Sequence, residues 1–323
     1  MSRRSRLGFG LLLLCVGCVL RPAAEVARPP LPVPPGVAER FAVPAWRPVR
    51  WDPPTPVGDG VVCRAGALDL AGREVGFSMY LPQAGGAPRP FLLVLPILAA
   101  GRSLLVRMCT DLAERGFVTG FAEREGGLFR RQEQPEELEA GIRRTVVENR
   151  AFLAWVAAQR EVDPQRMGLV GVSLGAIVGT VLTAMEPRIQ AASLLMAGGD
   201  LPALLVDTGE GRVASWAALE RARSHLTDAG LERELRAVLW TDPANVAAYI
   251  DSRRVFLFTA QLDGVVLRRN SELLWEALGR PHRLLAPLGH YTAAIAYFRI
   301  LGEVEDFSRA RFAALAPVSA PPR

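Results

Sequence analysis

The chain has 323 residues, of which 50% are hydrophobic and 22% are charged; this composition is typical of packed globular proteins and excludes disordered and collagen-like chains. Its formal net charge of +5 comes from arginine alone, because the sequence contains no lysine. The arginines are interleaved with 33 acidic residues and form no basic run or basic-aromatic stripe, so no nucleic-acid partner is expected.

Residues 1–18 have the pattern of a signal peptide. Three arginines within the first six residues precede an apolar run from residue 7 to residue 20. The stretch Cys15-Val16-Gly17-Cys18 resembles the lipobox of bacterial lipoproteins, which implies export and a lipid on Cys18 that anchors the protein in the cell envelope. Periplasmic or secreted protein without a lipid, and an uncleaved anchor, are the alternatives. No later stretch approaches the about 20 apolar residues of a membrane-spanning helix, so membrane contact is expected only through this anchor.

Residues 19–56 are predicted to be a linker. They are dense in proline and show neither a period of 2 nor one of 3.6, which is typical of a semi-extended spacer. The folded domain is therefore expected to span residues 57–323, a length that suits one large α/β domain.

Strands and helices are predicted to alternate along this domain. Two short β segments at residues 61–63 and 73–81 come first and favour an antiparallel opening. Apolar runs then predict buried strands at residues 91–98, 117–121, 166–172, 189–196, 255–260 and 282–286. Helical periodicity lies at residues 103–115, 135–160, 174–185 and 270–278, and a further helix ends the chain. The alternation predicts an α/β fold with a mostly parallel central sheet and helices on both faces.

Residues 171–175, Gly171-Val172-Ser173-Leu174-Gly175, match the Gly-x-Ser-x-Gly pattern. The motif lies between a predicted buried strand and a predicted apolar helix, the context in which two glycines allow a sharp turn that exposes the serine hydroxyl. The helix N-terminus beside the hydroxyl stabilises negative charge. Ser173 is therefore the candidate nucleophile, and a glycine-flanked turn in the core is the alternative.

A serine nucleophile needs a base, and the base needs an acid that orients it. His290 follows the last predicted strand and is the expected base. Asp263 follows the strand at residues 255–260, at the end of the sheet where ligands collect, and is the expected acid. The alternatives are His225 and His282 for the base and Asp200, Asp207 and Asp251 for the acid.

The order Ser173, Asp263, His290 on alternating strands and helices resembles that of the α/β-hydrolases over residues 60–310. The stretch Gly289-His290-Tyr291-Thr292 looks like its counterpart in dienelactone hydrolases and bacterial esterases. The resemblance implies that Ser173 attacks the substrate, that His290 acts as general base and then as general acid, and that Asp263 orients His290.

The resemblance also implies an oxyanion hole, formed by the backbone N–H groups of Leu174 and Leu98. At the second position Pro96-Ile97-Leu98 stands where the family has His-Gly-x, so the backbone path there departs from the pattern. This departure is the main argument for the alternative function, a catalytically silent surface lipoprotein of the same fold with a binding role.

Residues 200–250 are expected to form a helical cap, because the family commonly inserts one here and the segment has apolar faces at helical spacing. A cap would line a pocket for a partly apolar substrate, whereas two helices packed on the domain are the alternative. The function predicted most strongly is that of an exported serine hydrolase acting on carboxylic esters or other acyl substrates.

No metal or other cofactor is expected. The three histidines and the two cysteines outside the leader lack the spacing of a ligand set. Cys63 and Cys109 are expected to be buried free thiols, with a disulfide between them as the alternative in an oxidising compartment.

Overall fold

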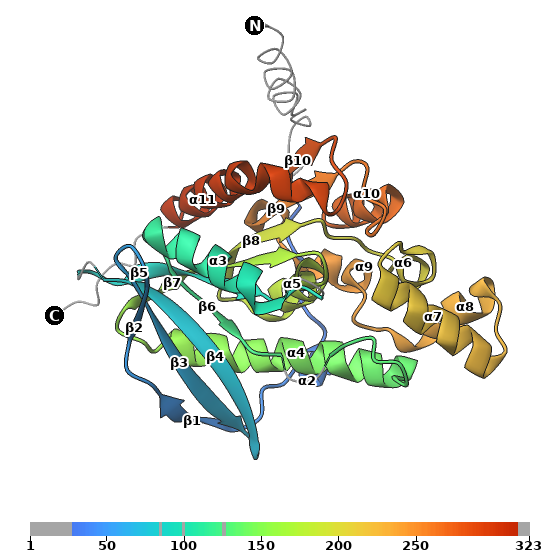
Figure 1. Ribbon diagram of the computed structural model, residues 1–323, viewed down its shortest axis with the longest axis horizontal. Coiled ribbons are helices and arrows are strands. Elements are labelled where there is room, and N and C mark those ends of the chain that lie inside the picture. Colours follow the sequence, from blue (N-terminus) through green and yellow to red (C-terminus); the bar gives the residue numbers. More distant parts are fainter. Residues whose placement is uncertain (1–27, 84–85, 99–100, 125–126, 316–323) are drawn as a thin grey trace, which may run out of the picture.

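The computed structural model describes residues 28–83, 86–98, 101–124 and 127–315. The signal peptide, the lipobox and Cys18 lie outside these ranges. The chain forms a ten-stranded sheet in the order β1-β3-β4-β6-β5-β7-β8-β9-β10, and β2 pairs with β3 (Figure 1). Within the described ranges, no helix combines the length and the apolar character that crossing a membrane requires.

The sheet is antiparallel at its beginning and parallel over the rest. The antiparallel strands are β1 (Trp46–Trp51), β2 (Thr55–Gly58), β3 (Val61–Leu70) and β4 (Arg73–Pro82), and β4 pairs antiparallel with β6. The parallel strands are β6 (Val118–Ala122), β5 (Arg89–Leu95), β7 (Val162–Val172), β8 (Ile189–Leu195), β9 (Val255–Ala260) and β10 (His282–Ala286). The predicted α/β fold and its antiparallel opening are confirmed. Because parallel strands end at the same edge, the loops after β5, β7, β9 and β10 meet there.

Helices cover both faces of this sheet. One face carries α3 (Gly101–Glu114) and α11 (Tyr297–Ala313), and the other carries α4 (Pro135–Val156), α5 (Leu174–Met185) and α10 (Arg268–Ala277). The long helix α4 begins at Pro135, where Glu137 Oε2 accepts the Gln134 N–H at 3.1 Å and proline occupies the first helical position. Its apolar stripe of Leu138, Ile142 and Val146 is fully buried.

A helical insert lies between β8 and β9. It consists of α6 (Leu201–Asp207), α7 (Gly211–Ser224), α8 (Asp228–Val238) and α9 (Pro243–Val246), and Figure 1 shows α6, α7 and α8 gathered at one end of the molecule. Trp216 of α7 fixes the insert to the segment before α4, because its Nε1 donates to the Glu133 carbonyl at 2.8 Å and its ring packs edge-on against Phe129. The segment at residues 200–250 is thus helical, as its periodicity predicts.

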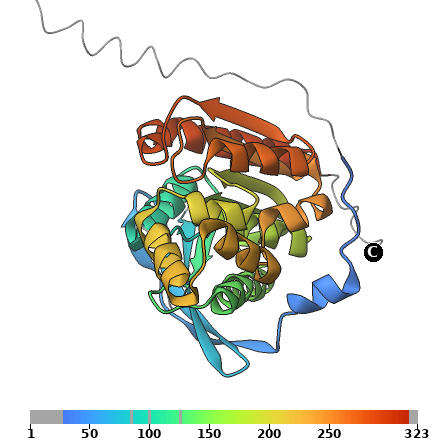
Figure 2. The ribbon, with the colours of Figure 1, turned by 90° about the vertical axis from the view of Figure 1, so that its right-hand side faces the viewer.

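The described part of the predicted linker is not an extended spacer. It contains the short helix α2 (Pro35–Arg40) and the strands β1 and β2, and Figure 2 shows it in blue, passing along the outside of the domain before it joins the sheet. Pro35 occupies the first turn of α2, and Pro48 and Pro56 lie in the short strands β1 and β2. These are positions that tolerate a residue without an N–H, so a high proline content does not exclude regular structure there.

Phe41, which follows α2, belongs to the core although the folded domain was expected to begin only at residue 57. Its side chain is 0% exposed and packs on Trp240 with ring centroids 5.7 Å apart. We expect Phe41→Ala to lower the free energy of unfolding by about 3–5 kcal/mol, because the substitution leaves a cavity in a packed core. Urea unfolding measures this change, with Leu31→Ala at a 60% exposed side chain as the control. Equal stabilities of the two variants would show that residues 28–56 do not contribute to the folded domain.

Candidate active site

Ser173 lies at the sharp turn between β7 and α5. Its backbone has φ 55° and ψ −120°, a conformation that residues other than glycine rarely adopt. The packing around the turn must therefore maintain it. The Ser173 N–H donates to the Leu195 carbonyl at 2.8 Å, which ties the turn to β8. The turn places the side chain at the N-terminus of α5, where the helix dipole favours negative charge.

The two glycines of the motif are required by close backbone approaches. A Cβ on Gly171 would lie 2.4 Å from the Gly175 carbonyl oxygen, and a Cβ on Gly175 would lie 2.7 Å from the Leu95 carbonyl oxygen. Both distances are shorter than a van der Waals contact. The atoms contacted belong to the backbone, so they cannot move aside as a flexible side chain could. The Gly-x-Ser-x-Gly spacing therefore follows from the packing of α5 against the ends of β5 and β7.

Gly171→Ala is expected to lower the free energy of unfolding by about 1–3 kcal/mol, because the added methyl group forces β7 and α5 apart. Gly302→Ala in α11 is the matched control, since a Cβ there meets nothing within 4 Å. Chemical unfolding of both variants tests the expectation. A Gly171→Ala protein as stable as the Gly302→Ala protein would contradict it.

Asp263 and His290 form a hydrogen-bonded pair. Asp263 Oδ2 lies 2.8 Å from His290 Nδ1, and Asp263 Oδ1 accepts the N–H groups of Val265 and Val266 at 2.8 and 2.9 Å. The side chains of Asp263 and His290 are 2% and 10% exposed. The carboxylate is held by the backbone of its own loop, and it favours the tautomer in which Nδ1 carries the hydrogen and Nε2 can accept a proton.

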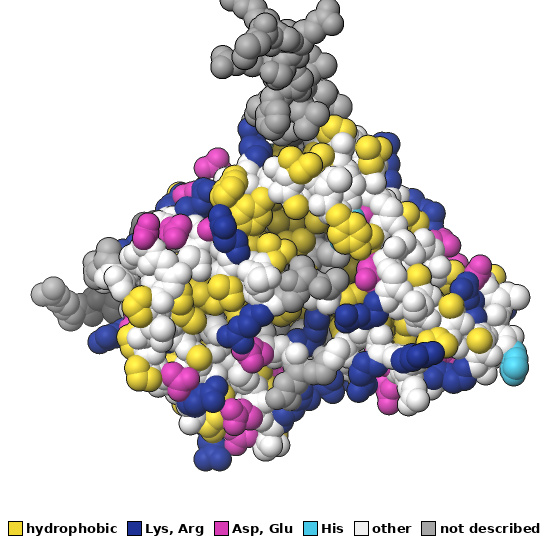
Figure 3. Space-filling view, in the orientation of Figure 1, with side chains coloured by type: hydrophobic (Ala, Val, Ile, Leu, Met, Phe, Trp, Pro, Cys, Tyr) yellow, Lys and Arg dark blue, Asp and Glu magenta, His cyan; other side chains and the backbone are white. Residues whose placement is uncertain are grey.

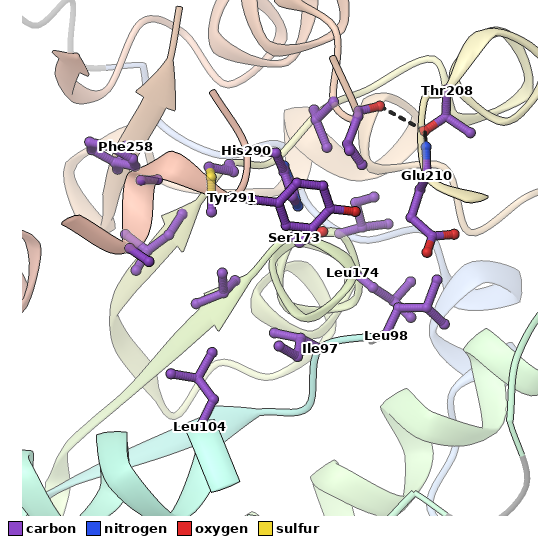
Figure 4. Close-up of a pocket in the computed structure, with 18 of the residues that line it drawn as sticks. Ile97, Leu98, Leu104, Ser173, Leu174, Thr208, Glu210, Phe258, His290 and Tyr291 are labelled. Atoms are coloured by element: carbon purple, nitrogen blue, oxygen red, sulfur yellow. Dashed lines mark hydrogen bonds between the residues drawn. The ribbon is translucent and has the colours of Figure 1, made fainter. Parts of the chain in front are cut away.

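The structure brings the three residues selected from the sequence to one place. Ser173, Asp263 and His290 come from the loops after β7, β9 and β10. Ser173 and His290 line the same cavity, and Figure 4 shows their side chains next to one another. A nucleophile, a base and an orienting acid are the groups that acyl transfer through a serine requires.

The alternative aspartates and histidines lie elsewhere. Each aspartate is bound to an arginine: Asp200 to Arg236, Asp207 to Arg269 and Asp251 to Arg253. His282 packs against the rings of Phe256 and Phe307 at the start of β10, and His225 ends α7. The residues that line the cavity include none of these five.

The cavity beside Ser173 has a volume of about 280 Å³ and mostly apolar walls. Figure 3 shows the hollow on the surface, with hydrophobic side chains around it. The insert contributes the polar residues Thr208 and Glu210, whose hydrogen bonds are drawn in part in Figure 4. Thr208 Oγ1 donates to the Val265 carbonyl at 2.9 Å, and Glu210 Oε2 accepts the Val213 N–H at 2.7 Å. Neither residue could be singled out from the sequence, because a short polar stretch within a helical insert has no distinctive pattern.

Leu98 and Leu174, the two expected oxyanion-hole residues, line the cavity and lie beside each other in Figure 4. Leu174 is the first residue of α5, so its N–H has no acceptor within the helix. The loop before Leu98 is held by Arg124, whose Nη2 donates to the Ile97 carbonyl at 3.2 Å and whose Nη1 donates to the Pro96 carbonyl at 3.5 Å. Burial, and then the charge of Arg212, lowers the pKa of Arg124.

Sequence reasoning did not select Arg124. It lies two residues after β6, one of the strands that end at the edge where the candidate site lies. The rule that selected Asp263, a polar residue directly after a buried strand, also applies to Arg124 and was the available signal.

Both cysteines of the described ranges are free thiols in the structure. Cys109 is buried and Cys63 is half-buried, and burial raises the pKa of each thiol. The disulfide alternative is not what the structure shows. Over the same ranges, His, Cys, Asp and Glu side chains form no group of three or more that could hold a metal ion.

No protein-family model matches the chain, and no curated protein sequence matches it either. Solved structures do match. The acetyl xylan esterase of Paenibacillus sp. R4 has a TM-score of 0.62 at 14% identity, covering 83% of this chain and 92% of its own. Acetyl xylan esterase 1 of Thermoanaerobacterium sp. JW/SL YS485 has a TM-score of 0.60 at 13% identity, with 87% and 96% covered.

A cold-adapted esterase from an Arctic intertidal metagenomic library matches with a TM-score of 0.55 and 17% identity, covering 81% of this chain and 99% of its own. Identities this low establish a shared fold and leave the activity to be argued from the site. The mostly parallel sheet, the helices on both faces and these neighbours together show that this chain has the α/β-hydrolase fold.

Proposed function

We propose that this protein is a serine hydrolase that cleaves carboxylic esters through an acyl-enzyme intermediate. The observation that carries the proposal is the 2.8 Å contact between Asp263 and His290, with His290 lining the same cavity as Ser173 at the N-terminus of α5. The esterases among the structural neighbours support it at the level of the fold.

Each proposed step uses a residue of this site. Ser173 Oγ attacks the ester carbonyl carbon while His290 Nε2 takes the serine proton, and Asp263 stabilises the resulting imidazolium. The N–H groups of Leu174 and Leu98 receive the oxyanion of the tetrahedral intermediate. His290 then gives the proton to the leaving alcohol as the C–O bond breaks. A water molecule, deprotonated by His290, attacks the acyl-enzyme, and the carboxylic acid leaves as Ser173 recovers its proton.

Labelling with an ethyl fluorophosphonate probe tests this proposal, because the probe reacts only with an activated serine. We expect the full-length protein to be labelled, with the label on the peptide that contains Ser173, and to hydrolyse short esters. A folded protein that takes up no label would contradict the proposal and favour the silent binding protein.

We further propose that the enzyme works in the cell envelope, attached by a lipid on Cys18. The support is the sequence of residues 1–18. Cys18→Ser is expected to abolish incorporation of a fatty-acid analogue in cells and to move the protein from the membrane fraction to the soluble fraction. Cys15→Ser is the matched control and should keep the lipid. Incorporation into the Cys18→Ser protein would contradict the proposed site.

A further inference from the structure

The cavity at Ser173 extends toward both faces of the sheet. Its apolar wall residues divide between the two hydrophobic cores that the sheet separates. One group, the α11 arm, packs with α3 and α11 and includes Leu104, Met108, Phe258, Ile300 and Val304. The other group, the cap arm, packs with α4 and the helical insert and includes Phe129, Ile142, Leu201, Leu205 and Val213.

Ser173 stands at the junction of these arms. Its preceding neighbour Val172 packs against the core of the α11 arm, and its following neighbour Leu174 belongs to the core of the cap arm. Figure 4 shows Leu104 and Phe258 on one side of Ser173, and Leu98 and Leu174 on the other. A carbonyl group at Ser173 would therefore have an apolar channel on each side.

We propose that the substrate is a neutral ester with an apolar group on both sides of the scissile bond, one group in each arm. The inference rests on the proposed function and deepens it. The acyl and alcohol groups of an ester extend from opposite sides of the carboxyl unit, which matches the placement of the two arms about Ser173. Sugar hydroxyl groups would lose their water hydrogen bonds against these walls without replacement. Among the described residues that line the cavity, Glu210 is the one acidic side chain, and it disfavours an anionic substrate.

A matrix of esters tests the two arms. We would measure kcat/KM for acetate, butyrate and octanoate esters of ethanol, butanol and octanol. Each CH₂ that leaves water for an apolar wall is expected to raise kcat/KM by about fourfold until the arm is full. The increase in kcat/KM should occur when the acyl group is lengthened and also when the alcohol group is lengthened. An acetylated sugar and an ester carrying a free carboxylate should both be poorer substrates than the neutral dialkyl esters.

Two variants assign the arms. Leu104→Trp fills the α11 arm, and Val213→Phe fills the cap arm; neither residue belongs to the proposed catalytic machinery. Each variant should remove the length dependence on one side of the ester only, and the two should act on different sides. Ethyl fluorophosphonate should still label the Ser173 peptide in both variants, whatever the rate, which shows that the variants are folded and that Ser173 is active.

The outcomes separate this inference from the proposed function. Three results from an active enzyme would contradict the two-arm inference alone. These are a kcat/KM that does not depend on the length of the acyl or the alcohol group, a preference for the acetylated sugar, and loss of the length dependence on the same side of the ester in both variants. A wild-type protein without labelling or hydrolysis would overturn the proposed function and this inference with it.

A second inference concerns Arg124 and rests on different contacts. In a trans peptide unit the carbonyl and the following N–H point in opposite directions. The Ile97 carbonyl accepts a hydrogen bond from Arg124, which is not among the cavity-lining residues. The Leu98 N–H of the same peptide unit therefore points away from Arg124, and Leu98 and Ser173 line the same cavity.

We infer that Arg124 is a positioning residue that holds the Leu98 N–H toward the oxyanion. The loop that it holds is the one in which Pro96-Ile97-Leu98 stands where the family has His-Gly-x. This inference also rests on the proposed function. An oxyanion contact exists only in the transition state, so its loss lowers kcat and leaves KM nearly unchanged.

Arg124→Met is expected to lower kcat by about 100-fold, the loss typical of one oxyanion donor, while KM changes less than threefold. Arg124→Lys should recover part of the loss, because it can still donate to one carbonyl. Arg160→Met, at a 92% exposed side chain, is the control. Affinity for a boronic acid, which mimics the tetrahedral intermediate, should fall in proportion to kcat. An unchanged kcat, or a loss that appears in KM and in the unfolding midpoint alone, would overturn the inference.

Discussion

Ser173→Ala is expected to lower kcat by about 10⁶-fold and to abolish fluorophosphonate labelling, because the variant has no nucleophile for the ester carbonyl. The loss should leave the fold intact, since the hydroxyl is replaced by a hydrogen and the backbone strain at φ 55° is carried by the turn itself. The measurement is ester hydrolysis under single-turnover conditions, with circular dichroism to verify folding.

Ser215→Ala provides the matched control, because Ser215 is an exposed serine in α7 that donates to the Gly211 carbonyl. It should hydrolyse esters at the wild-type rate. Residual hydrolysis by Ser173→Ala at more than one hundredth of the wild-type rate would mean that another residue or a bound water performs the attack.

Asp263→Asn is expected to lower kcat by about 10⁴-fold with little change in stability. The asparagine oxygen can still accept the N–H groups of Val265 and Val266, so the loop keeps its hydrogen bonds. Its amide nitrogen then faces His290 Nδ1 and donates to it. His290 must carry its hydrogen on Nε2 in that tautomer and cannot accept the proton of Ser173.

Asp200→Asn is the informative control, since Asp200 lies in the loop after β8 and is one of the alternative acids. Its carboxylate binds Arg236 at 2.8 Å, and its loss should change kcat by less than threefold. Comparable losses in both variants, or a larger loss in Asp200→Asn, would contradict the assignment of the acid. Steady-state ester hydrolysis by both variants at one pH gives the comparison.

The sequence-based interpretation succeeded where the pattern is local. Alternating apolar runs and helical periods predicted the order of strands and helices from residue 91 onward, because each element must bury one stripe or face. The two glycines around Ser173 predicted the turn, because only glycine permits the close approach of α5 to β5 and β7. These features depend on a few neighbouring residues and therefore leave a readable pattern.

The interpretation failed at residues 28–56, where composition was the only guide. Proline density suggested a spacer, yet β1 pairs with β3 in the register Trp46↔Leu70 and Phe41 packs against Trp240. Proline at the first turn of a helix or in a short edge strand gives the same composition as an extended linker. The partner of this segment is supplied by residues far along the chain, so local reasoning had no means of finding it.

The sequence by itself determined the elbow around Ser173, the alternation of the fold and a short list of candidate acids and bases. Only the tertiary structure decided which of them meet: Asp263 lies 2.8 Å from His290, whereas Asp200 binds Arg236. The tertiary structure also decided that Arg124 binds the Pro96 and Ile97 carbonyls and that residues of both hydrophobic cores line the cavity at Ser173. Such contacts depend on which strands end at the same edge of the sheet, and that order is set by packing between residues distant in the chain.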